Sequence, residues 1–254
     1  ASGGLSRSWD WGCHWLHCAT VNPLVPWADK LGTRYDTKPR EDYASIWRGA
    51  FLAPDEMAKA QANIDAFFDR IHSAGKAGKD VAVSEVMPPA NTETAAARMI
   101  FQLLSGDDPE VVSAAGYSDY DDVEADWPVL TGYGALIAAM AEGLPIRLAT
   151  PVRAVRHRAA GVEVDTDSGT LRARAAIVTV SANVLQSGAI AFGAGPAADL
   201  VADMETINCG SYEKVAFTLT DMPAEFRGKL FTSIDTGHDA GPLNFQIIED
   251  EAPM

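Results

Sequence analysis

The chain has 254 residues, 47% of them hydrophobic and 22% charged, which is enough for a substantial core in one large domain or two small ones. Its 35 acidic and 20 basic residues give a formal net charge of −15, which opposes nucleic-acid binding and favours cationic partners, amines among them. The sequence has no apolar run of about 18 residues, so we expect no membrane span.

The first residues, ASGGLSRS, lack the basic and apolar stretches of a secretory signal. Three cysteines cannot all pair in disulfides, which favours a reducing compartment, and we expect a cytoplasmic protein. The sequence gives no indication of the oligomeric state.

Helix signals dominate the first 116 residues, where caps and glycines bound runs with helical spacing. The clearest run, from Pro54 to His72, has an apolar stripe on one face, as expected of a helix that packs on a core. The other expected helices run from the cap Asn22, with Pro23 at the first helical position, to Gly32, from Asn91 to Leu104 before Gly106, and from Asp108-Pro109 to about Gly116. Gly75 is expected to end the clearest one.

Strand patterns follow from residue 145 onward. Val152–Arg158 and Gly161–Asp165 alternate apolar and polar residues, and a turn follows at 167–169. Ala175–Val180 is continuously apolar, which predicts a strand buried on both faces. Two more strands are expected at Lys214–Leu219 and Leu243–Ile247.

The stretch from Trp9 to Trp27 holds four of the six tryptophans, two of the three cysteines and two of the five histidines. Exposing so much aromatic area to water is unfavourable, so we expect this stretch to be buried or to line a cavity. One interpretation is a metal site, because four zinc-type ligands fall within six residues, at Cys13, His14, His17 and Cys18. In a strand, however, Cys13 and His17 face one side and the other pair the opposite side. A second interpretation is an aromatic strand that only packs a core.

The third interpretation is a resemblance. Gly12-Cys13-His14-Trp15-Leu16-His17, followed by Asn22-Pro23-Leu24 and Leu31-Gly32, resembles the flavin-facing segment of FAD-dependent amine oxidases, the family of monoamine and polyamine oxidases. Later motifs arrive in the family's order. Residues 129–152 resemble its stretch from a glycine-rich turn to the strand that meets the adenine of FAD, and Gly210–Val215 resembles its Gly-x-x-x-Lys-Val.

The glycine-rich turn, Gly132-Tyr133-Gly134, has two other interpretations. It resembles the first half of a dinucleotide fingerprint and could cradle phosphate, but it lacks the third glycine and the acidic residue about 20 positions on. Otherwise it is a turn that leads into a helix at Ala135–Glu142. The acidic stretch Asp119–Asp126, with five acids in eight residues, is typical of a solvated loop, or it lies near a substrate entrance and attracts ammonium groups.

The resemblance implies oxidation of a small-molecule amine to an imine by hydride transfer to FAD, after which water hydrolyses the imine and oxygen reoxidises the flavin with peroxide release. It implies that Lys214 holds a water against the flavin, that His17 lies near the substrate amine, and that Gly12, Cys13 and Val152 contact FAD. A neutral imidazole could accept the amine's proton, since its unperturbed pKa is about 6.5. From the residues alone, Lys214 could instead be a solvent-facing lysine of an edge strand, and His17 a core histidine.

We therefore expect a mixed α/β fold with a helix-rich substrate region and a β-rich part of an FAD-binding domain. The expected parts are a flavin-facing segment at 1–19, a helical substrate domain at 20–126, part of the FAD-binding domain at 127–207 and a substrate-domain sheet at 208–254. The family's Gly-x-Gly-x-x-Gly unit and its C-terminal flavin segment have no counterpart in these residues, so we expect a partial enzyme that is inactive alone. An FAD-dependent desaturase and a non-catalytic binding module are the alternatives.

Overall fold

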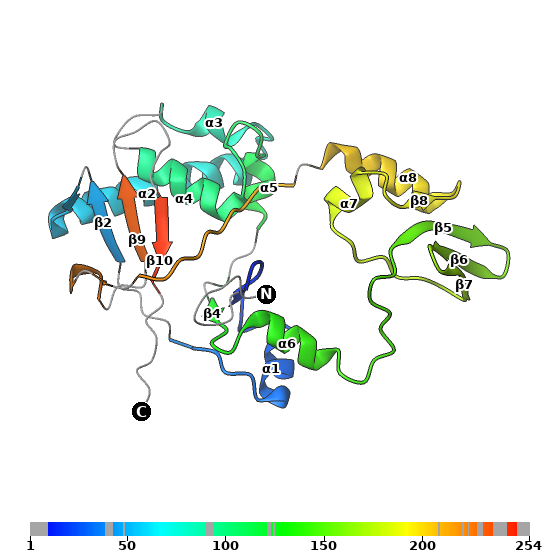
Figure 1. Cartoon of the computed structure of the whole chain (residues 1–254). Helices are drawn as coiled ribbons and strands as arrows, with labels where there is room; N and C mark the ends of the chain where they lie inside the picture. Colours follow the sequence, from blue (N-terminus) through cyan, green and yellow to red (C-terminus); the bar gives the residue numbers. More distant parts are fainter. Residues whose placement is uncertain are drawn as a thin grey trace. The chain divides into compact units, whose positions relative to one another are not determined.

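The computed structural model describes residues 10–38, 43–47, 49–89, 94–120, 123, 125–207, 209–219, 221–222, 224–227, 231–235 and 243–247. The chain forms two compact units, which are described separately (Figure 1). The first consists of Ala1–Glu142 and Tyr212–Met254, and the second of Gly143–Ser211. Helices and strands occur in both, which confirms the predicted mixed α/β fold.

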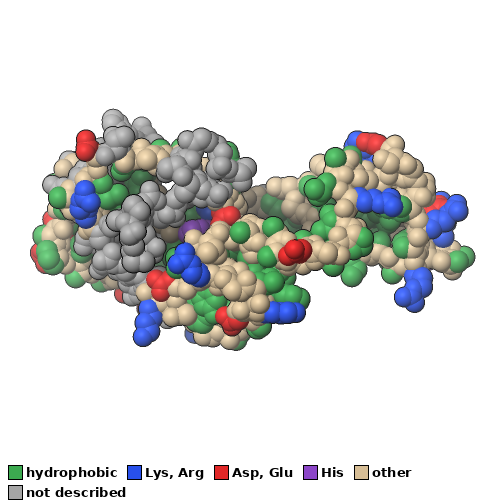
Figure 2. Space-filling model, turned by 60° about the horizontal axis from the view of Figure 1, so that its bottom comes forward, with side chains coloured by type: hydrophobic (Ala, Val, Ile, Leu, Met, Phe, Trp, Pro, Cys, Tyr) green, Lys and Arg blue, Asp and Glu red, His purple; other side chains and the backbone are tan. Residues whose placement is uncertain are grey.

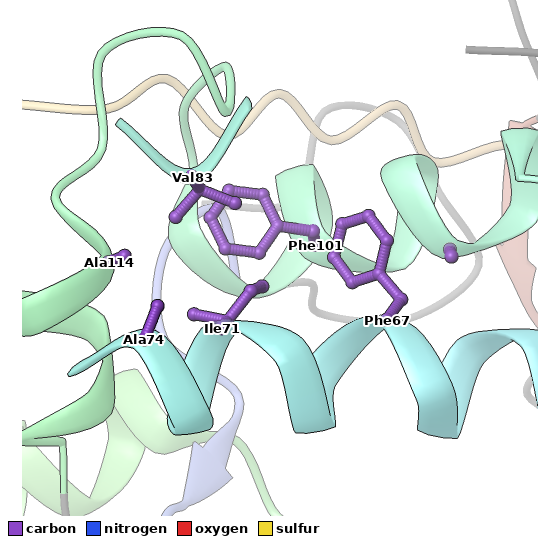
Figure 3. Packing of buried hydrophobic residues seen from close by; sticks show 7 residues of the cluster. Phe67, Ile71, Ala74, Val83, Phe101 and Ala114 are labelled. Carbon is purple, nitrogen blue, oxygen red and sulfur yellow. The ribbon is translucent and has the colours of Figure 1, made fainter. Parts of the chain in front are cut away.

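The helical part of the first unit is organised around one long helix, α2 (Pro54–Lys76), and its predicted apolar stripe is confirmed. It packs with α3 (Val83–Val86), α4 (Ala95–Ser105) and α5 (Ala114–Ser118). Figure 3 shows Phe101 of α4 between Val83 and Phe67, above Ile71 of α2. The ring centroids of Phe67 and Phe101 lie 6.0 Å apart. These side chains form the main hydrophobic core of the unit.

Gly75 does not end α2, contrary to the prediction, because the helix continues to Lys76. Its role is close packing. A Cβ atom at Gly75 would lie 2.1 Å from Cβ of Ser118 on α5, so only glycine lets the two helices approach this closely.

The predicted helix from Asp108-Pro109 to Gly116 is wrong. Residues 109–111 form a turn, and α5 begins only at Ala114, where the hydroxyl of Ser113 accepts a hydrogen bond from the Gly116 amide at 3.0 Å. Helix α3 supplies the reason, since its amides at Val83 and Ser84 donate to the carbonyls of Val112 and Pro109, both at 2.9 Å. Carbonyls used in this way hold the segment in a non-helical path.

Glycine sets the C-terminal ends of two other helices, α1 (Val25–Leu31) and α4. Helix α1 ends at Gly32, whose φ of 68° is left-handed, and α4 ends at Gly106 with φ of 73°, both as predicted. The start of α1 is two residues later than predicted, because the Asn22 side chain accepts a bond from the Leu24 amide in a turn before the helix. The predicted cap Asn91 lies outside the described residues.

The first unit also holds a sheet in the order β10-β9-β2-β3, beside the helices in Figure 1. Its strands are β2 (Tyr43–Trp47), β3 (Ala50–Phe51), β9 (Phe231–Asp235) and β10 (Leu243–Gln246). Strand β10 confirms the prediction for 243–247 almost to the residue. The predicted strand Lys214–Leu219 is wrong, since this segment is extended but pairs with no described strand, and its alternating Val215, Phe217 and Leu219 are exposed.

Four further elements belong to the described part of the first unit. Strand β1 (Trp15–Leu16) pairs antiparallel with β4 (Trp127–Pro128). Leu16, Ala19 and Val129 form a small buried core at this pair of strands. Helix α6 (Tyr133–Met140) follows β4. It begins and ends two residues earlier than the predicted helix Ala135–Glu142. A short 3-10 turn lies at Ala224–Phe226.

The second unit is a four-stranded sheet in the order β7-β6-β5-β8 with two helices. Strands β5 (Val152–Arg158) and β6 (Gly161–Thr166) confirm the two predicted strands and pair antiparallel. After the predicted turn, β7 (Gly169–Ala173), which was not predicted, pairs antiparallel to β6, and β8 (Ala191–Phe192) pairs parallel to β5. The helices are α7 (Ala182–Gln186) and α8 (Pro196–Asp203), followed by a 3-10 turn at Met204–Thr206. Arginine side chains stand out on the surface of this unit in Figure 2, and several pair with acids across the hairpins.

The predicted buried strand at 175–180 is wrong. This segment pairs with no described strand, and Ile177 is 90% exposed. The edge of β5 away from β6 is taken by β8, so the apolar run does not pair there. Within the described residues, no helix is long and apolar enough to cross a membrane.

Candidate functional site

The candidate site is built on residues 12–18, here called the strip. Strand β1 lies at its centre, where Leu16 is fully buried and the Val129 amide donates to the His14 carbonyl at 3.0 Å. The expectation that the aromatic stretch is buried or lines a cavity holds only in part. Leu16 and Ala19 are buried in the small core, and Leu24 and Val25 pack against it, whereas Trp11 is 67% exposed. The strand itself is two residues long and ends in a turn at His17. The strip is therefore anchored through buried Leu16, while its other residues are partly or fully exposed.

Lys214 reaches the strip from a segment 202 residues away. Its ammonium nitrogen donates to the Gly12 carbonyl at 2.7 Å and lies 5.5 Å from the centroid of the Tyr212 ring. Partial burial raises the pKa of Tyr212 above its ordinary value. Among the residues that the structure describes, none lies within 4 Å of the position that a Cβ would take at Gly12. The strip thus offers an open stretch of backbone with a cation fixed at its edge.

His17 lies at the other end of the strip and contacts Asp126. Its Nδ1 is 2.9 Å from Oδ1 of Asp126, and the same oxygen accepts a bond from the Cys18 amide at 3.3 Å. The His17 side chain is 65% exposed and that of Asp126 39%. The core-histidine interpretation is wrong, because the ring is exposed and its partner is a carboxylate.

Asp10, two residues before the strip, joins this part of the chain to helix α6. Its carboxylate accepts bonds from the amides of Tyr133 at 2.6 Å and Gly134 at 3.0 Å, at the first turn of the helix. Gly132 precedes the helix with φ of 96° and has no side chain to cap it, and a Cβ at Gly134 would be 3.2 Å from the carboxylate. The two glycines therefore serve to admit Asp10. Asp10 was not predicted as a site residue, because its partners are 123 and 124 residues away along the chain.

The other candidate residues are arranged as follows. Cys13 is exposed on the strip. The pKa of Tyr133 is raised, first by its own burial and then by its electrostatic interaction with Cys13. The amide nitrogen of Gln246 on β10 lies 3.4 Å from Nε2 of His14. Val152 begins β5 in the second unit, where it pairs with Thr166, and is described apart from the strip. Across the described residues, no three or more histidine, cysteine or acidic side chains are grouped to hold a metal ion.

The chain is similar in sequence to known proteins of one family. The family described as flavin containing amine oxidoreductase matches residues 97–232, more than half of the chain. Human lysine-specific histone demethylase 2 and mouse lysine-specific histone demethylase 1B are each 36% identical to the chain over 93 residues, which is 36% of this chain and 11% of theirs.

Solved structures of putrescine oxidase share the fold. A triple mutant redesigned for cofactor binding superposes with a TM-score of 0.51 at 17% identity and covers 72% of this chain and 49% of its own. The wild type bound to putrescine gives a TM-score of 0.51, also at 17% identity, over 71% of this chain and 49% of its own. The chain thus spans about half the length of these structures.

These findings define the fold of an FAD-dependent amine oxidase. The chain belongs to the family of flavin containing amine oxidoreductases.

The family implies FAD as the cofactor. The backbone of the strip fits the flavin ring, whereas the first turn of α6 does not fit the pyrophosphate. The open backbone at Gly12, with the Lys214 ammonium beside it, can lie against a flat polar ring. The first amides of α6, by contrast, already bind the Asp10 carboxylate, so they are not a phosphate cradle. The interpretation of Gly132-Tyr133-Gly134 as a turn that leads into a helix is the one the geometry supports.

Proposed function

We propose that this protein oxidises a small-molecule amine to an imine with FAD, and that these 254 residues act as part of that enzyme. The observation that carries the proposal is the bond from the Lys214 ammonium to the Gly12 carbonyl at 2.7 Å, which joins two motifs of the family resemblance across 202 residues. Membership of the flavin containing amine oxidoreductases supports it. When bound, FAD would supply the hydride acceptor for the amine and the redox chemistry that reduces oxygen to peroxide.

In this proposal Gly12 and Cys13 lie against the flavin ring and the Val152 backbone binds the adenine. Lys214, held by the Gly12 carbonyl, keeps a water in place beside the ring. His17 takes the proton from the substrate ammonium, since an amine must be neutral before its carbon can lose hydride. Its exposed ring at the end of the strip is accessible to such a substrate.

Charge supports a cationic substrate. The second unit contains six arginines and six acidic residues, which cancel, so the whole net charge of −15 belongs to the first unit. That unit contains the strip. A field of one sign raises the local concentration of oppositely charged ligands. It disfavours nucleic acid as a partner, and the low cysteine count supports a cytoplasmic location.

The proposal is tested by peroxide release. The flavin-loaded enzyme, with excess FAD kept in the buffer, is offered primary amines, diamines and polyamines together with neutral analogues of the same carbon skeletons. We expect peroxide only with amines. Flavin reduction by a neutral analogue would favour a desaturase, and no reduction by any compound at full FAD occupancy would favour a binding module.

His17→Asn tests the proton acceptor. We expect amine turnover to fall by about 100-fold, the lower part of the range for loss of a general base, with little change in melting temperature. His157→Asn, at an exposed position of β5, is the matched control and should change neither the turnover nor the melting temperature. Equal turnover in the two variants would remove His17 from the reaction.

A further inference from the structure

We infer that Asp126 is a positioning residue that fixes the tautomer of His17, with the proton on Nδ1 and the lone pair on Nε2. The inference rests on the proposed role of His17 as proton acceptor. Asp126 belongs to the acidic stretch that the sequence alone presents as a solvated loop or as a stretch near a substrate entrance. Its contacts instead join it to the strip.

The chemistry of the two partners determines where the proton lies. An ionised carboxylate only accepts hydrogen bonds, so the imidazole nitrogen 2.9 Å from Oδ1 of Asp126 must be the one that carries hydrogen. That nitrogen is Nδ1. In the neutral ring the lone pair is then on Nε2, at the opposite edge. This edge is the one left for a substrate, because the Nδ1 edge is occupied by the carboxylate.

The backbone around His17 is also fixed, in part by hydrogen bonds that do not involve the Asp126 side chain. The Ala19 amide donates to the Ala125 carbonyl at 2.6 Å, and the Asn22 side chain donates to the His17 carbonyl at 2.7 Å. Cys18 has a φ of 50°, a left-handed conformation that costs energy in a non-glycine residue. Its amide is held by Oδ1 of Asp126 at 3.3 Å. A single carboxylate thus stabilises the strained turn and orients the ring next to it.

The consequence for the reaction is a defined path for one proton. The bond between the substrate nitrogen and its proton breaks, and a new bond forms between that proton and Nε2 of His17. The imidazolium so formed carries hydrogen on both nitrogens and lies beside the Asp126 carboxylate, which compensates its charge. With the other tautomer, Nε2 would already carry hydrogen and could not accept the proton.

Nitrogen NMR of the full chain tests the tautomer without flavin or substrate. The chain has five histidines, and the His17 signals are identified by their loss in His17→Asn. Above the pH at which the ring signals stop moving, we expect a pyrrole-type shift at Nδ1 and a pyridine-type shift at Nε2. Asp126→Asn, which keeps an acceptor oxygen, should retain this pattern, and Asp126→Ala should lose it. Asp119→Ala, an exposed acid of the same stretch, should have no effect.

The reverse pattern in the parent chain, or an unchanged pattern in Asp126→Ala, would overturn the inference. Should Asp126→Ala fail to fold, the parent spectrum and Asp126→Asn still decide. In the flavin-loaded enzyme we expect Asp126→Ala to lower kcat by about 10- to 100-fold with little change in KM, and Asp126→Asn to lower it less. If His17→Asn leaves turnover unchanged, the proton-acceptor role fails while the NMR result for Asp126 still stands, so the two failures are distinguishable.

Discussion

Replacing Asp10 with alanine removes both acceptors from the first turn of α6. Bonds to a charged group contribute about 1.5–3 kcal/mol each when buried, and an N-cap residue contributes about 1 kcal/mol. Asp10 is half-buried, so its two bonds lie toward the lower end of these ranges. We expect Asp10→Ala to lower the free energy of unfolding of the first unit by about 2 kcal/mol. Asp10→Asn, which keeps one acceptor oxygen, should lower it by about 1 kcal/mol.

Tryptophan fluorescence during urea unfolding measures this effect on the first unit alone. All six tryptophans belong to that unit, and the second unit has neither tryptophan nor tyrosine. A loss of 2 kcal/mol corresponds to a decrease in melting temperature of about 4–8 °C in a unit of this size. Asp221→Asn, at an exposed position, is the matched control and should change the midpoint little.

Two results would contradict the role of Asp10 as the cap of α6. One is an alanine variant as stable as the control, which would mean that water replaces the carboxylate at no cost. The other is tighter FAD binding by Asp10→Asn, since this would show that the α6 amides are a phosphate site from which Asp10 is displaced.

Three further predictions concern other parts of the chain. Lys214→Met should leave the fold intact and slow the reoxidation of the flavin by oxygen in stopped flow; an unchanged rate would place the ammonium outside the reaction. Phe101→Ala should destabilise the first unit by about 3–5 kcal/mol in urea, whereas Leu104→Ala, 63% exposed on the same helix, should cost under about 1 kcal/mol. Hydrogen bonds from Arg158 and Arg172 lower the pKa of Glu163. Its ionised form therefore favours the folded hairpin above the unfolded pKa of about 4, and this contribution is lost as the pH falls through the lowered value. Amide NMR of β6 during acid titration should show this loss in the parent chain and not in Glu163→Gln.

The features that sequence predicts here are those encoded by near neighbours. Gly32 and Gly106 end their helices because a left-handed residue is needed one position past the last turn. The stripe of α2 and the strands β5 and β6 follow from spacing alone. Strands β2 and β9 were not predicted, since they pair in parallel across a separation of 188 residues and have no strong pattern of their own.

The failures have the same physical origin. The apolar run at 175–180 has the composition of a central strand, yet a strand exists only where a partner supplies its hydrogen bonds, and β8 holds that position beside β5. In the candidate site, Gly12 and His17 could be singled out from a local motif. Asp10 and Asp126 could not, because an acidic residue in an acidic chain carries no signal until its distant partner is known.

The three contacts that hold the strip have one feature in common. Asp10, Asp126 and Lys214 each join residues separated by more than 100 positions, and each does so with a charged group bonded to backbone or ring atoms of the site. Between Gly12 and Cys18, only Leu16 is anchored by full burial in an apolar core. Contacts between partly exposed charged groups are individually modest in energy, and salt and pH change them more than they change packing. We therefore expect the geometry of the site to be disturbed under conditions that leave the helical core around Phe101 folded.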